Sequence, residues 1–113
     1  MPQPEIYYIN QRGKSVSLEL TNHARMRFYY RWKRIFPGET LLPEEVDIVL
    51  KRWFESSYRI EPNSYELKKR LKKHGKDTLY FKNKPFLFVI QSASIRTVEI
   101  SDDNCRELNK KEK

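Results

Sequence analysis

One stretch of the sequence spaces basic and aromatic side chains so that they would share one face of a helix. His23 and Arg27 are four residues apart, and Tyr30 and Arg34 follow at intervals of three and four. At about 100° per residue these side chains fall within a narrow stripe, with Arg31 at its edge. A guanidinium group matches phosphate geometry, and an imidazole has a pKa near neutrality. The stripe therefore predicts a surface that faces phosphate groups.

Other interpretations of this stripe remain open on the sequence alone. His23 stands near the expected start of the helix, where its side chain could simply pack against the fold or cap the helix. Arg27 and Arg31 could lie on a solvated face or form ion pairs instead. The acidic residues available for such pairs are Glu39, Glu44 and Glu45. Arg25 falls near the apolar side of the helix, so we expect it to be paired inside the fold.

The chain carries a net charge of +8, and two segments hold the excess. Residues 21–37 contain five basic and no acidic residues, and residues 64–84 contain eight basic and two acidic ones. Clustered Lys and Arg neutralise phosphates and release counterions, so these segments indicate a nucleic-acid partner. An acidic protein partner and an ordinary solvated basic face are the alternatives. A membrane surface is not expected, because no strong apolar face flanks the most basic segment.

The second basic segment predicts a short helix that begins near Asn63 and ends at Gly75. Its candidate nucleic-acid-binding residues are Lys69, Lys72, Lys73 and His74. For His74 we favour a structural interpretation, because a cation at a helix C-terminus complements the helix dipole. A catalytic pair of His23 and His74 is conceivable, but nothing in the sequence brings the two residues together.

Composition excludes several classes of protein. No apolar run approaches the roughly 18–20 residues that span a bilayer, and the N-terminal residues do not resemble a signal peptide. The single Cys105 cannot form an internal disulfide, so we expect a cytoplasmic protein. Two His and one Cys do not make a tetrahedral zinc site, and three scattered glycines cannot form a phosphate-binding loop. We therefore expect no metal and no cofactor.

The hydrophobic pattern predicts the elements that would position the stripe. Residues 6–9 and 15–20 predict a hairpin, and a helix should run from Thr21 or Asn22 to about Phe36. A second helix is expected from Pro43 to about residue 56, because apolar residues recur there at helical spacing. A strand at 58–60 and three later strands, at 78–81, 86–90 and 95–100, complete the pattern.

These elements predict a single α+β domain over residues 1–113, with a loose polar tail from about residue 101. Its N-terminal hairpin and two helices should pack on an antiparallel sheet of about four strands. The short basic helix would be inserted before the C-terminal meander. Trp32 and Trp53 stand at helical core spacing, so we expect both in the core.

The order of elements and the basic first helix resemble the RelE/ParE-like toxin fold. Residues 20–27, Leu-Thr-Asn-His-Ala-Arg-Met-Arg, followed by Arg31, look like the His-Ala-x-x-Arg-x-x-x-Arg opening of a poorly characterised domain family grouped with those toxins. Residues 43–50 resemble the acidic start of that family's second helix, and residues 95–98 resemble its closing strand. The longer link between the helices and the basic segment at 63–75 depart from the family's pattern.

The resemblance implies a small domain that binds RNA, rather than DNA, and cleaves it without a metal. Such cleavage needs a base for the 2′-OH, a cation for the phosphate and an acid for the leaving oxygen. The candidate catalytic residues are His23, Arg27 and Arg96. The alternatives are a nucleic-acid-binding module without catalysis, and a toxin-like domain with a protein target, whose acidic partner would resemble an antitoxin.

Overall fold

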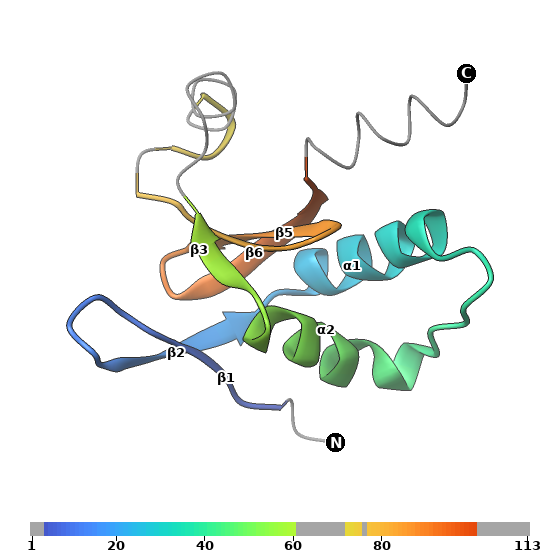
Figure 1. Ribbon diagram of the computed structural model, residues 1–113, viewed down its shortest axis with the longest axis horizontal. Helices are drawn as coiled ribbons and strands as arrows, with labels where there is room; N and C mark the ends of the chain where they lie inside the picture. The colour runs from blue at the N-terminus through green and yellow to red at the C-terminus, as the bar shows by residue number, and fades with distance from the viewer. Residues whose placement is uncertain (1–3, 61–71, 76, 102–113) are drawn as a thin grey trace.

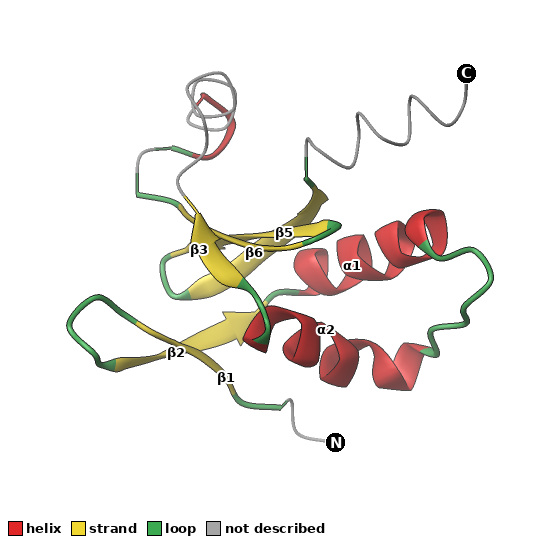
Figure 2. Ribbon diagram, in the orientation of Figure 1, coloured by secondary structure: helices red, strands yellow, loops and turns green. Residues whose placement is uncertain are grey.

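The computed structural model describes residues 4–60, 72–75 and 77–101. Two helices lie side by side against one face of a curled sheet (Figures 1 and 2). In chain order the elements are β1 (Ile6–Ile9), β2 (Ser15–Leu20), α1 (Asn22–Ile35), the 3-10 turn η1 (Pro43–Glu45), α2 (Val46–Glu55), β3 (Tyr58–Ile60), β4 (Leu79–Asn83), β5 (Phe86–Gln91) and β6 (Ser94–Ile100). The expected α+β class is confirmed, and the helices and strands of the described residues follow the expected order.

Within the described residues the sheet has six strands, in the order β1-β2-β6-β5-β4-β3. The prediction of an antiparallel sheet of about four strands was therefore wrong in both number and direction. The N-terminal hairpin joins the sheet because β2 pairs in parallel with β6, Glu19 opposite Ser94 and Leu20 opposite Ile95. The other pairings between neighbouring described strands are antiparallel.

The main core lies between the two helices and the sheet. Side chains of a strand alternate between faces, and Phe86 and Phe88 of β5 point toward the helices. The ring of Phe86 lies 4.8 Å from Phe28 of α1 and 5.2 Å from Trp53 of α2. Trp32 is 8% exposed, and Trp53 is partly buried against the same cluster. Both tryptophans are thus core residues, as expected.

The opposite face of the sheet carries a smaller cluster of Tyr80, Leu87 and Val89. Residues 72–74 form a helical turn that ends at Gly75. The φ of Gly75 is +91°, a value that glycine adopts without a steric clash because it has no Cβ atom. The ring of His74 lies 6.4 Å from the ring of Tyr80, so this turn packs over the smaller cluster. The rest of the predicted basic helix lies outside the described residues, and so do residues 102–113 of the expected tail.

The edge of β6 that faces β2 loses its strand partner after Ile95. Over the following residues of β6, α1 takes the place of a strand. Thr21 Oγ1 donates to the backbone oxygens of Ile95, at 2.8 Å, and Arg96, at 3.2 Å. Arg31 Nε donates to the backbone oxygen of Val98 at 2.6 Å. These contacts fix the position of α1 along β6.

Candidate nucleic-acid interface

Helix α1 carries the predicted stripe, and its sequence explains how the stripe comes to face solvent. Thr21 caps the helix, since its Oγ1 accepts a hydrogen bond from the Ala24 amide at 3.1 Å. Ala24, Phe28 and Trp32 are buried against the sheet. The first turn of α1 contains no acidic residue, so nothing there offsets the positive end of the helix dipole.

Arg25 is held within the fold, as expected. Its Nε donates to Asp47 Oδ1 at 2.5 Å and its Nη2 donates to Asp47 Oδ2 at 3.0 Å, while Nη1 donates to Asn22. Because Arg25 donates these hydrogen bonds to the Asp47 carboxylate, the pKa of Arg25 is raised above its ordinary value. This bidentate pair ties α1 to α2, so Arg25 is a structural residue.

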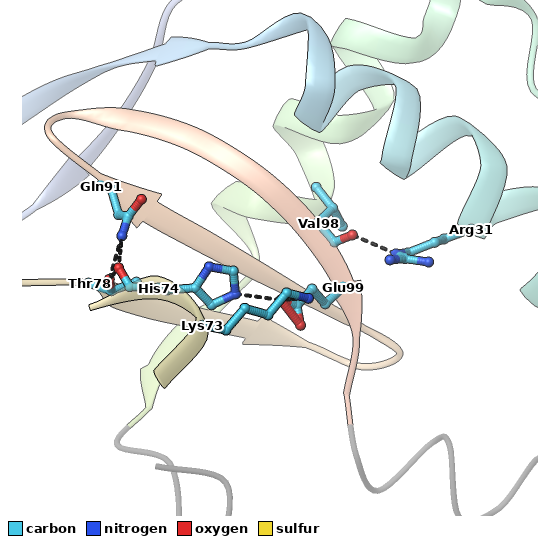
Figure 3. A network of polar contacts seen from close by, with 7 residues as sticks. All are labelled: Arg31, Lys73, His74, Thr78, Gln91, Val98 and Glu99. Carbon is cyan, nitrogen blue, oxygen red and sulfur yellow. Dashed lines mark hydrogen bonds and ion pairs between the residues drawn. The ribbon is translucent and has the colours of Figure 1, made fainter. Parts of the chain in front are cut away.

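Arg31 was predicted to contact phosphate, and the structure instead directs its Nε to the Val98 backbone oxygen. Figure 3 shows this guanidinium reaching from α1 to β6. Its contact satisfies a carbonyl group on the strand edge that β2 leaves without a strand partner. Arg31 therefore has a structural role, which the sequence does not indicate.

The solvent side of α1 keeps three of the predicted residues that could bind an anion: His23, Arg27 and Arg34. All three are exposed. Within the described part of the chain none of them forms a hydrogen bond or an ion pair, and the acidic candidates Glu39 and Glu44 do not contact them. Glu45 instead accepts from the Leu42 amide at 3.4 Å. These three side chains remain available to a ligand.

Arg96 lies beside the first turn of the same helix. Thr97 pairs with Val89 and Ile95 with Ile90, so the register shift leaves Arg96 opposite no residue of β5. Bulges of this kind re-aim a side chain. The side chain of Arg96 is exposed, and its backbone oxygen accepts from Thr21, two residues before His23. We call His23, Arg27, Arg34 and Arg96 the basic face.

The second predicted group of residues lies on the other side of the sheet. His74 Nε2 lies 2.7 Å from Glu99 Oε1, and both side chains are 11% exposed. The His74 backbone oxygen accepts from Thr78 Oγ1 at 3.0 Å and also from the Gln91 amide. Figure 3 shows these contacts converging on the turn at residues 72–74. His74 thus anchors this turn, which agrees with the structural interpretation.

The lysines of this second segment have different surroundings. Lys73 Nζ lies 3.5 Å from Glu99 Oε1, while Lys72 is exposed and Lys69 lies outside the described residues. Helix α1 and the turn at residues 72–74 pack against opposite faces of the sheet, so His23 and His74 do not form a pair. The structure thus places His23, Arg27 and Arg34 along the exposed side of α1, with Arg96 beside the first turn, and leaves Lys72, Lys73 and His74 on the other side of the sheet.

Two features of this region are not predicted from the sequence. The His74–Glu99 contact joins residues 25 positions apart, and neither flanking sequence signals it. An apolar hollow also opens between α1 and η1, next to Tyr30. The sequence signal available for this hollow was the placement of two large side chains, Met26 and Tyr30, away from the buried side of the helix.

The basic face can bind phosphate groups, because guanidinium donors and a helix N-terminus both favour anions. Among the described residues no cluster of three or more His, Cys, Asp or Glu could hold a metal ion. In the same residues no helix is long and apolar enough to cross a membrane.

Comparison with known proteins adds no relative: no family model, no curated protein and no solved structure matches this chain.

Proposed function

We propose that this chain binds RNA through the basic face of α1. The observation that carries the proposal is the contrast between the arginines of one helix. Arg25 donates hydrogen bonds to Asp47, and Arg31 donates one to the backbone oxygen of Val98. In contrast, Arg27 and Arg34 are exposed without a partner in the described residues. Exposed cations that the fold does not need are the ones a polyanion can use.

The choice of RNA over DNA rests on the resemblance to the RelE/ParE-like toxins. By the same resemblance we propose that the bound RNA is cleaved without a metal. His23 takes the proton of the 2′-OH, whose oxygen attacks phosphorus, the 5′-oxygen leaves and is protonated by water, and Arg27 and Arg96 stabilise charge on the phosphate. His23 is exposed and Arg96 lies beside its turn, so the arrangement supports this assignment.

Binding is tested by fluorescence anisotropy with a 5′-labelled single-stranded RNA at several salt concentrations. Each lost phosphate contact lowers the slope of log affinity against log salt by about 0.7 on single strands. The double variant Arg27→Ala/Arg34→Ala should therefore bind more weakly and show a slope smaller by about 1.4. The charge-matched control Arg12→Ala/Arg52→Ala changes two exposed arginines outside the basic face and should keep the wild-type slope.

Equal salt slopes for the two double variants would contradict the proposed face. Cleavage is followed in the same samples, in EDTA, beside His23→Ala. If the wild type cuts the RNA and His23→Ala does not, the catalytic assignment is supported. If the RNA stays intact with both proteins, the function is limited to binding. The unfolding free energy of each variant, measured in parallel, confirms that the exposed substitutions leave the fold intact.

A further inference from the structure

A hollow of about 220 Å³ opens at the surface between α1 and η1. Its walls are almost entirely apolar or aromatic, and the ion-paired Arg25 contributes the one charged group. The lining residues are Arg25, Met26, Tyr29, Tyr30, Pro43 and Val46. Small-molecule sites are typically concave and mostly apolar with few polar groups, so this hollow has the character of a ligand site.

Two large apolar side chains at this hollow are left in solvent. Met26 is 54% exposed and Tyr30 is 57% exposed. Both stand on the side of α1 away from Ala24 and Phe28, so the core gains nothing from them. The Tyr30 ring is held in a T-shaped contact with Tyr29, at 5.7 Å between centroids, which leaves an aromatic surface in a defined position.

Tyr30 belongs to both the hollow and the basic stripe. It stands three residues after Arg27 and four before Arg34, and side chains at these spacings are neighbours on a helix surface. On the other side of the hollow, η1 contains the exposed carboxylates Glu44 and Glu45 between the lining residues Pro43 and Val46. A polyanion can therefore bind along the α1 side of the hollow but is repelled from the η1 side.

We infer that the hollow is a base-binding subsite for single-stranded RNA. Phosphates contact Arg27 and Arg34, and one unpaired base turns inward and stacks on Tyr30. This inference rests on the proposed function and adds a substrate class to it. A base inside a duplex is stacked and paired, so it cannot enter the hollow without being extruded. The apolar lining offers few partners to base edges, so the subsite accepts different bases.

The test combines binding with a probe of stacking. The ligand is a single-stranded RNA that carries one 2-aminopurine, whose fluorescence is quenched when it stacks on an aromatic ring. Tyr30→Ala should weaken binding about 5- to 100-fold and relieve the quenching, because base–aromatic stacking contributes that much. Tyr30→Phe keeps the ring and should retain affinity and quenching.

Tyr58 provides the matched control, because it is 58% exposed on β3, outside the hollow. Tyr58→Ala should bind as the wild type does. A strand of the same length with abasic sugars throughout should bind equally to the wild type and to Tyr30→Ala. RNA duplex should bind more weakly than single strand and show no dependence on Tyr30.

The outcomes separate failure of the subsite from failure of RNA binding. If Arg27→Ala/Arg34→Ala weakens binding but Tyr30→Ala does not, the base subsite is overturned while the RNA-binding face stands. If the wild type binds no oligonucleotide, both proposals fall. A synthetic glutamate–leucine peptide that competes with RNA and depends on Tyr30 would assign the hollow to a protein ligand and also overturn the base subsite.

Discussion

At the scale of single residues, the arginines of α1 differ in what their guanidinium groups contact. The sequence predicted that Arg25 faces inward, because helical spacing puts it near the side of α1 that carries the apolar residues Phe28 and Trp32. It could not predict the role of Arg31, whose acceptor is a backbone oxygen 67 positions later. Helical spacing shows which side chains share a face, but not which long-range partner reaches that face.

Stability measurements should separate Arg31 from Arg27. Arg31→Ala removes a charged donor from the Val98 oxygen, so the free energy of unfolding should fall by about 1–3 kcal/mol. Arg27→Ala removes an exposed side chain and should change it by no more than about 0.5 kcal/mol. Urea unfolding followed by circular dichroism gives both values, and equal stability of the two variants would refute the structural role of Arg31.

At the scale of elements, local pattern predicted most of the boundaries. The hairpin strands at 6–9 and 15–20 and the helix from Asn22 have the bounds that alternation and capping indicated. The parallel pairing of β2 with β6 was missed, because strand partners far apart in the chain leave no local signal. The candidate site depended on that pairing, since it places Arg96 beside the start of α1.

The turn between β5 and β6 has a conformation that its residues do not favour. Ser92 and Ala93 have φ of 50° and 57°, and a two-residue hairpin turn of this kind prefers glycine or asparagine. Ala93→Gly should therefore raise the free energy of unfolding by about 1 kcal/mol. Gly13→Ala makes the opposite change, because Gly13 has a φ of 76° with open space around it, and should lower stability. Thermal denaturation of both variants checks the two signs, and a loss of stability in Ala93→Gly would contradict this account.

At the scale of the whole molecule, one core connects both helices to both ends of the sheet. The ring of Tyr8 on β1 lies 5.4 Å from Phe81 on β4, although three strands of the sheet separate these two. The sheet therefore curls around α1 and α2, and the smaller cluster on its outer face is covered by the turn that His74 anchors.

Because both helices and the sheet contribute to one core, we expect the chain to unfold in a single transition. Trp32 on α1 and Trp53 on α2 contact each other, with ring centroids 5.9 Å apart, and both pack against Phe86 of β5. Tryptophan fluorescence and far-ultraviolet circular dichroism should thus report the same midpoint in urea. If fluorescence changes at a lower urea concentration, the helices detach before the sheet unfolds, and the single cooperative unit is refuted.

The contacts between α1 and β6 also bear on the order in which a ribosome delivers the chain. The hydroxyl of Thr21 bonds to an oxygen 74 positions later, and β2 pairs with β6, the last strand among the described residues. During translation the basic helix therefore emerges long before the strand that positions it. The apolar side of α1 therefore stays exposed in the nascent chain, and the proposed RNA-binding surface is completed only when β6 has left the exit tunnel.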